Sequence, residues 1–488
     1  MNIIGSFQPI KKLPMYFFIL FLLSSSVNAL TESEFVELLL DNAFFEKEQI
    51  NLAIKQIEMQ GDRDNYGNWE FEIGGEIGRI NKSKNKFDYT SSTDYAKSTN
   101  QNVRKISTDL TKKFFSNGSE LNISYDKSLP VKNEEMHDKN GYQLDKDTTE
   151  YLDDIEVSWT LPLLKNKNGV VDQKTYDLAV LDYKDEKLLL AEVKEDFIED
   201  KLMIFLDWVG YKEQIRIVKN RLNVSKDILF KIKQADVNKG SILAMKRSID
   251  KSTRIILKLE SKLKAEQKSL SILLKSIDIN KNPLVVNWDM KPNLINDLNA
   301  YCQTNVRDIQ RIEIEKIQNN RYIKTYDNSQ LPDLDFTITA SKDDNKGNYS
   351  TYSKSSETEY EAKIEFSYPL TGDISNEVYL SKYRLKSRQL ELKYQDKFDD
   401  VLSAAKKLNT EIKQGIKRLE LYKSQINSID VQSAELKEFL SGNGNIHFVI
   451  GELNDNQDLS IEYVIAAIDF HKSRVKYDSL LDRLFVSN

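Results

Sequence analysis

The amino-acid sequence contains one arrangement of elements twice, and this duplication limits the folds open to the chain. Each copy reads as a helix, strands, a very long helix, a turn and a further long helix. The last strand of each copy ends in a Pro-Leu pair, at Pro162-Leu163 and at Pro369-Leu370, and the two prolines are 207 positions apart (369 − 162). We expect a first structural repeat over residues 30–282 and a second over residues 283–488.

The helices that follow the Pro-Leu pairs are predicted to be long and to form antiparallel coiled coils. About 67 proline-free residues at a rise of ~1.5 Å give a helix of roughly 100 Å, which predicts an elongated molecule. A strict seven-residue repeat is typical of a coiled-coil seam, and a plain amphipathic core helix is the alternative. The residues in this repeat are Ile242, Ile249, Ile256, Leu263 and Leu270 in copy one, and Ile461, Ile468 and Val475 in copy two.

The predicted strands alternate between apolar and charged residues. The first has Trp69, Phe71, Ile73 and Ile77 on one face and glutamates on the other. The last has Ala362, Ile364, Phe366 and Tyr368 opposite Lys363, Glu365 and Ser367. A period of two with one apolar face predicts a sheet that is wet on one side, either a soluble sandwich or part of a membrane barrel. Two such strands per copy, four in all, are too few to close a barrel alone.

Residues 81–152 form a polar insertion that only copy one contains. It includes a predicted hairpin, in which Thr108–Phe115 and Glu120–Tyr125 flank an Asn-Gly turn at Asn117-Gly118. The sequence leaves open whether this insertion is a surface loop or adds strands to the sheet.

The N-terminus has the pattern of a secretory signal peptide over residues 1–29. Lys11 and Lys12 precede an apolar run, and small residues lead up to a predicted cleavage site after Ala29. After Leu30 there is no apolar stretch of the length that a transmembrane helix needs. We therefore expect an exported protein that does not cross a membrane by helices.

Composition excludes several classes of function. The net charge of −6 and the absence of a basic block give no support to nucleic-acid binding. The single cysteine, Cys302, rules out a disulfide framework. With only three histidines, His137, His447 and His471, the counts also argue against a Cys/His zinc site. No nucleophile with a base and no phosphate-binding loop is visible. We predict no catalytic residue, no metal and no cofactor.

In the order of these features, the chain resembles the TolC-like outer-membrane efflux protein family. The resemblance covers essentially the whole chain after the signal peptide. It implies a mainly α, α+β fold in which long coiled-coil helices form a periplasmic α-barrel. It also implies a homotrimer whose protomers each add four strands to one β-barrel in the outer membrane of a Gram-negative cell. The partners implied are outer-membrane lipid, a periplasmic adaptor and an inner-membrane transporter, in efflux or in type I secretion.

The resemblance also assigns roles to residues. Pro162, Leu163, Pro369 and Leu370 are similar to the turns where strand passes into helix. The predicted adaptor-docking tips are Lys239, Gly240, Ser241, Ile242, Gly451, Glu452 and Leu453. Asp455 and Asp458 are candidates for a pore constriction, and charges that favour a helix N-terminus are the alternative interpretation. The strand residues expected to face the lumen are Glu70, Glu72, Glu76, Glu156, Asp335 and Glu365.

The function that follows is a passive channel with porin activity, which exports substrates delivered by a transporter. The main alternative is an elongated periplasmic coiled-coil adaptor or surface protein without a pore, which would explain the helices but not the duplicated strands. An enzyme is a more distant alternative. The exported substrate and the transporter class are not encoded in any pattern of the chain.

Overall fold

The computed structural model describes residues 30–40, 42–88, 93–128, 131–133, 136–137, 143–145, 148–234, 239–273, 285–288, 291–347, 355–368, 374–427 and 445–485. The predicted signal peptide lies outside the described residues. The chain divides into two compact units. Unit 1 comprises Met1–Asn42, Asp196–Leu294 and Leu408–Ser479, and unit 2 comprises the remainder. Each unit takes segments from both predicted repeats.

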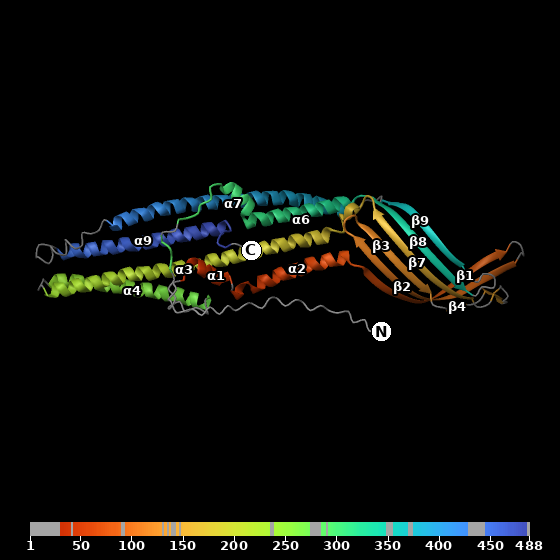
Figure 1. The fold of residues 1–488 in the computed structure, drawn as a ribbon, viewed down its shortest axis with the longest axis horizontal. Helices are drawn as coiled ribbons and strands as arrows, with labels where there is room; N and C mark the ends of the chain where they lie inside the picture. Colours follow the sequence, from red (N-terminus) through yellow and green to blue (C-terminus); the bar gives the residue numbers. More distant parts are fainter. Residues whose placement is uncertain are drawn as a thin grey trace. The chain divides into compact units, whose positions relative to one another are not determined.

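Unit 2 contains a large antiparallel sheet, shown in Figure 1 with its strands side by side. The order along the hydrogen-bonded path is β1-β2-β3-β7-β8-β9, and the short β4 pairs with β7. A separate pair joins β5 to β6. The strand bounds are Glu70–Asp88 (β1), Thr93–Phe114 (β2), Ser119–Ser128 (β3), Val131–Asn133 (β4), Met136–His137 (β5), Gln143–Asp145 (β6), Thr148–Pro162 (β7), Asp333–Gly347 (β8) and Ser355–Ser367 (β9).

The structure confirms the predicted combination of long helices and antiparallel strands. The predicted number of strands, four, is wrong. The four expected strands are β1, β7, β8 and β9. Two more, β2 and β3, come from the polar insertion and lie between β1 and β7. The predicted hairpin at Asn117-Gly118 is therefore confirmed, and the insertion adds strands to the sheet. Four strands were expected because the polar sequence of residues 81–103 lacks the alternation that marks β1.

The turn between β2 and β3 packs against the turn that follows β7. Gly118 and Gly169 both have a positive φ, 74° and 64°. A Cβ on Gly118 would lie 2.5 Å from the carbonyl oxygen of Asn166, and one on Gly169 would lie 2.4 Å from that of Phe115. The Gln173 side-chain amide also donates a hydrogen bond to the Phe115 carbonyl. Neither position can accept a side chain without strain, so the close packing of these two turns depends on both glycines.

The helical part of unit 2 includes a buried charged cluster around Arg307. The helices that lie wholly in this unit are α2 (Glu46–Gly67), α5 (Leu298–Asn305) and α6 (Arg307–Ser329), with the short η1 (Ala43–Phe45) before α2 and η2 (Lys167–Gly169) after β7. Arg307, at the start of α6, is 7% exposed and contacts Glu195 at 3.2 Å and Asp482 at 3.0 Å. The guanidinium carbon of Arg307 also lies 5.2 Å from the centroid of the Phe485 ring. This cluster joins segments that are far apart in the sequence.

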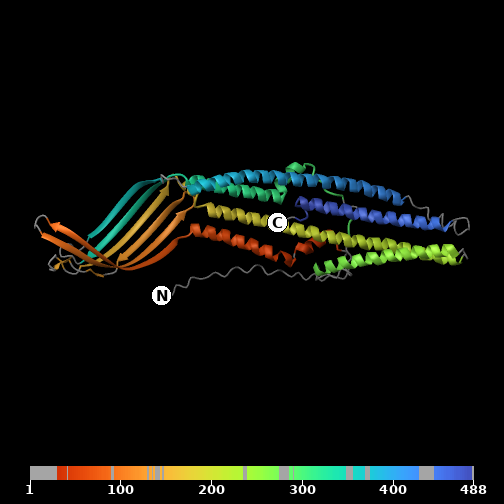
Figure 2. The ribbon, with the colours of Figure 1, turned by 180° about the vertical axis from the view of Figure 1, so that it is seen from behind.

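Unit 1 is built from long helices packed along apolar seams. It contains α1 (Glu32–Leu40), α4 (Lys239–Leu273) and all but the last residue of α9 (Ile446–Leu480). It also contains the later parts of α3 (Lys174–Gln234) and α7 (Ile374–Asn427). Figures 1 and 2 show α4 beside α3 from opposite sides. The seven-residue repeat of α4 lies on this seam, since Ile256 and Leu270 are buried and Ile242, Ile249 and Leu263 pack against buried clusters.

Among the helices that the structure describes, none combines the length and the apolar character needed to cross a lipid bilayer.

Candidate functional site

The sheet of unit 2 has two chemically opposite faces, which the strand register defines. Residues paired directly across an antiparallel ladder point to the same side. One such row runs Phe71, Leu110, Ile123, Val157, Ala340 and Tyr360. Every strand of the path therefore contributes to one face, which we call the apolar face. Its larger members are Phe71, Ile73, Ile77, Ile106, Leu110, Ile123, Tyr125, Ile155, Val157, Trp159, Phe336, Ile338, Tyr360, Ile364 and Phe366.

Several large side chains of the apolar face are exposed in the part of the chain that the structure describes. Ile77 is 87% exposed, Tyr360 is 81% exposed, and Ile364 and Phe366 are each 66% exposed. Monomeric soluble proteins rarely expose a continuous apolar patch of this kind, so the face requires lipid or another protein surface. Lys112 lies over the rings of Trp69 and Phe114 at 5.2 and 5.7 Å, so aromatic rings with a polar partner stand at the end of the band near the β2–β3 turn.

The opposite face of the sheet is rich in carboxylates, and we call it the acidic face. All six residues predicted to face a lumen lie on it, at positions that alternate with the apolar row. The sequence reasoning missed further members, because their strands were not recognised or were read as too short. The acidic residues of this face include Glu70, Glu72, Glu76, Asp109, Glu120, Asp126, Glu156, Asp335, Asp343, Glu359, Glu361 and Glu365.

Lysines neutralise only part of the acidic face. Lys105 of β2 contacts Asp126 of the neighbouring β3 at 2.6 Å, and Lys363 contacts Glu365 two residues along the same strand at 3.2 Å. Cross-strand pairs of unlike charge stabilise a sheet modestly, whereas adjacent carboxylates repel one another. The surplus of carboxylates gives this face a negative field that attracts cations.

The Pro-Leu turn of the first repeat lies where β7 ends. Pro162 is the last residue of β7 and pairs in register with Asp335. The next amide, that of Leu163, donates a 2.8 Å hydrogen bond to the carbonyl of Leu334, so the ladder ends without an unpaired donor. The counterpart at Pro369 and Leu370 lies outside the described residues.

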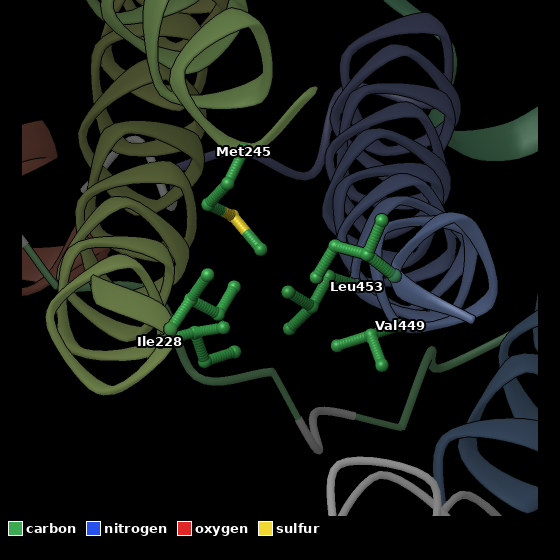
Figure 3. Close-up of a cluster of buried hydrophobic side chains, with 6 residues drawn as sticks. Ile228, Met245, Val449 and Leu453 are labelled. Atoms are coloured by element: carbon green, nitrogen blue, oxygen red, sulfur yellow. The ribbon is translucent and has the colours of Figure 1, made fainter. Parts of the chain in front are cut away.

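The second candidate surface is the end of unit 1 at which α3 gives way to α4 and α9 begins. We call this end the tip. A buried apolar cluster holds it together, and in Figure 3 Ile228, Met245, Val449 and Leu453 point toward one another from three helices. Met245 is fully buried, and Leu453 is 6% exposed. The tip is therefore a packed end of the helices.

The predicted docking residues divide into two groups in the structure. Lys239 and Gly240 are exposed in the first turn of α4. Ser241 and Leu453 are buried, and Ile242 packs against the cluster of Figure 3, so these three side chains face the core. Gly451 and Glu452 are half-buried in the second turn of α9. Outside the helix's own backbone, no atom of the described residues lies within 4 Å of a Cβ placed on Gly451.

Three exposed apolar side chains at the tip were not among the docking residues predicted from the sequence. Phe230 of α3 is 63% exposed, Leu243 of α4 is 50% exposed, and Phe448 of α9 is 67% exposed. Each sits beside a buried position of the same helix, so the sequence alone reads it as part of the core stripe. These side chains give the tip an exposed apolar surface.

Asp455 and Asp458 lie on the exposed side of α9. The helix begins at Ile446, so both residues are beyond its first two turns. A favourable interaction with the helix N-terminus falls off within the first turn and does not account for them. Behind them, the buried Arg221 donates to the Gln457 amide oxygen at 2.7 Å and to Ser248 at 3.1 Å. Burial lowers the pKa of Arg221, and Asp458 opposes this effect.

His471, one of the three histidines, is buried in unit 1. It is 1% exposed, and its ring lies against Phe470 and Trp288 at 5.3 and 6.1 Å between centroids. Neither ring nitrogen has a hydrogen-bond partner among the described residues. Burial, with a further contribution from Arg474, lowers the pKa of His471 to about 4. His471 is a neutral core side chain at neutral pH.

This pKa makes the stability of unit 1 dependent on pH. The unfolded chain takes up a proton below pH 6.5 and the folded chain only below about 4. Stability is therefore lost as pH falls between these values, by up to about 3 kcal/mol. We expect His471→Phe to flatten this acid loss in thermal unfolding at pH 7 and pH 5. His447→Phe, at an exposed position, is the matched control and should leave the loss unchanged. Equal acid loss in both variants would contradict the assignment.

Comparison with known proteins identifies the fold. No family model matches the sequence, and no curated protein matches it. Solved structures do match. The transmembrane channel protein CusC is 13% identical with a TM-score of 0.58, over 92% of this chain and 92% of that one. The CmeC outer membrane channel of Campylobacter jejuni is 13% identical (TM-score 0.53, 93% and 86%). The open MtrE outer membrane channel of Neisseria gonorrhoeae is 10% identical (TM-score 0.53, 92% and 88%). The chain has the fold of these channels, as its resemblance to the TolC-like family predicted.

Proposed function

We propose that the chain is one protomer of a homotrimeric outer-membrane channel that exports substrates passively. In this proposal the apolar face of the sheet meets lipid, and the acidic face lines a water-filled lumen. The helices extend into the periplasm, and the tip meets an adaptor joined to an inner-membrane transporter. The system is a tripartite efflux pump or a type I secretion machine.

The main support for the proposal is the exposed apolar face of the sheet, together with the acidic face on the opposite side of the same strands. A transmembrane strand alternates in this way, lipid side apolar and water side polar. The apolar positions run from Trp69, directly before β1, to Ile77 within it, and from Tyr360 within β9 to Tyr368, directly after it. Nine residues at ~3.3 Å, tilted by ~40°, rise about 23 Å, close to the ~25 Å band of outer-membrane barrels. The band is therefore tall enough for a membrane.

The lumen and the tip supply the steps of transport. Three copies would repeat each carboxylate of the acidic face as a ring, which focuses the negative field and favours cations. Asp455 and Asp458 are exposed on α9 and are our candidates for a constriction near the tip. Opening would be a repacking of the tip helices, which contacts with the adaptor bias by binding one state better than the other.

Membrane fractionation tests the proposal against its main alternative. A protein whose apolar face meets lipid should sediment with the outer membrane, resist extraction by urea or carbonate, and need detergent for purification as a trimer. An elongated periplasmic adaptor without a pore should extract without detergent. Recovery of the full chain as a soluble species would refute the proposal.

The docking role of the tip makes a separate prediction at Gly451. Because no described atom outside its own helix backbone lies within 4 Å of its Cβ, Gly451→Trp should leave folding and the trimer intact. The bulky ring should block the adaptor and reduce export by about tenfold or more, since losing one well-packed contact costs at least ~1.4 kcal/mol. Export in cells and crosslinking to the adaptor measure this. Gly61→Trp, at an equally open helical glycine in α2, is the control; equal export from both variants would contradict docking at Gly451.

A further inference from the structure

The sheet ends in two strand edges that have no partner within the described residues. β1 pairs only with β2, and β9 pairs only with β8. The six strands of the path alternate in direction, so β1 and β9 run in opposite directions. An edge of this length exposes a row of unpaired N–H and C=O groups, which cannot remain unpaired in lipid. Each edge therefore needs a strand, and a second copy offers one of the correct direction.

The hairpin formed by β2 and β3 crosses the same apolar band as its neighbours. Ile106 and Leu110 of β2, with Ile123 and Tyr125 of β3, stand in the apolar rows defined by β1 and β7. Their intervening residues Asp109 and Ser124 pair on the acidic face. The turn of the hairpin is fixed through Gly118 and Gly169. Lys112 and Lys127 stand on the same face at the two ends of this apolar stretch. β2 and β3 therefore have the alternation of membrane strands, over a shorter apolar span than β1.

We propose that β9 of one copy pairs with β1 of the next, so that three copies of a six-strand path close a barrel of eighteen strands. This inference rests on the proposed trimeric channel and fixes the width of its membrane pore. The hairpin of the insertion adds two strands per copy to the four that the sequence predicts, which alone would give twelve.

One register of the pairing between β9 and the next copy's β1 matches the charge and the size of the side chains on the two strands. With Glu76 opposite Lys363, unlike charges meet on the acidic face. The same register sets Gly74 opposite Glu365 and Gly78 opposite Glu361, so these two carboxylates face glycines. On the apolar face it sets Ile73 opposite Phe366 and Gly75 opposite Ile364. Complementary charge and size across the two edges favour a second copy as the partner.

The stagger of the sheet agrees with closure in this register. The hydrogen-bonded row that starts at Phe71 reaches Tyr360 on β9, whereas the proposed register sets Phe71 opposite Tyr368. The row therefore shifts by eight residues (368 − 360) across six strands. With ~3.3 Å per residue and ~4.8 Å between strands, this shift is a tilt of about 40°, within the range that closed barrels adopt.

The strand count sets the width of the pore. At the same tilt and spacing, twelve strands give a backbone radius of about 12 Å and eighteen give about 18 Å. A lumen of the larger size admits correspondingly larger cargo at the outer membrane.

Disulfide crosslinking in the outer membrane tests the pairing. In a Cys302→Ala background, Glu76→Cys with Lys363→Cys should give covalent dimers and trimers on oxidation, because residues directly opposite lie within disulfide range. Glu76→Cys with Glu359→Cys is the control, about 13 Å out of register, and should give none. A ladder from the control pair alone, or from neither pair in an intact trimer, would overturn the register.

The number of strands is tested on the same membranes. Single cysteines at Ile106 and Ile123 should resist a membrane-impermeant maleimide, and those at Asp109 and Ser124 should react through the lumen. Electron microscopy of the purified trimer should then show eighteen strands. A membrane trimer with twelve strands and a reactive Ile106→Cys would overturn this inference while leaving the proposed function intact. A protein that forms no membrane trimer would overturn the proposed function itself.

Discussion

Arginine at both Ile338 and Ile364 should remove the trimer from the outer membrane. These side chains are 45% and 66% exposed on the apolar face, in neighbouring strands β8 and β9. An arginine at the middle of a membrane barrel costs about 2–4 kcal/mol, and this double variant places two in every copy. We expect degradation or periplasmic accumulation of the variant, measured as the loss of the heat-resistant trimer band from outer-membrane fractions.

The matched control has the same charges on the other side of the sheet. Thr339→Arg with Glu361→Arg alters a directly opposed pair of β8 and β9 on the acidic face. Water in the lumen would solvate these arginines, so the trimer should persist. Equal loss of trimer from both double variants would show that the two faces do not meet different environments.

Removal of Arg307 should destabilise unit 2 more than any exposed charge change. Arg307→Ala leaves Glu195, which is 1% exposed, and Asp482 without their common cation. Burial already raises the pKa of Glu195 to about 7, although Arg307 and the Leu484 amide favour its charged form. Breaking a buried ion pair by removing one partner costs about 3–5 kcal/mol. Denaturant unfolding of the detergent-solubilised trimer should show this loss.

Two comparisons separate the loss of a buried partner from the loss of an arginine. Arg384→Ala removes an exposed pair with Asp327 and should change stability by less than ~1 kcal/mol. Arg307→Met combined with Glu195→Met replaces charges by apolar groups and should recover much of the stability lost in Arg307→Ala. If Arg307→Ala and Arg384→Ala were equally stable, the buried cluster would not stabilise unit 2.

The parts of the fold predicted from the sequence are those that local patterns determine. Alternation over Phe71–Ile77 and over Ala362–Tyr368 was enough to predict β1 and β9 and their two faces. The seven-residue repeat of α4 was enough to predict its seam, because a helix that buries one stripe must repeat it at that period. The turn at Gly118 was predicted from an Asn-Gly dipeptide, whose preference is local.

The parts that could not be predicted depend on contacts between distant segments. That β2 and β3 join the sheet is decided by pairing with β1 and β7, and no local signal carries this information. Arg307 meets partners 112 and 175 positions away. At the tip, Ile242 and Phe448 are both apolar, and only the packing of three helices shows that the first faces the core and the second faces outward.

The most direct test of the proposed channel is single-channel recording of the purified trimer in a planar bilayer with a salt gradient. A pore lined by the acidic face should give stepwise conductance with a cation-selective reversal potential. Glu361→Arg combined with Thr339→Arg should shift that potential toward anion selectivity. The absence of conductance from correctly folded trimers, or a reversal potential that these lumen charges do not change, would contradict the account.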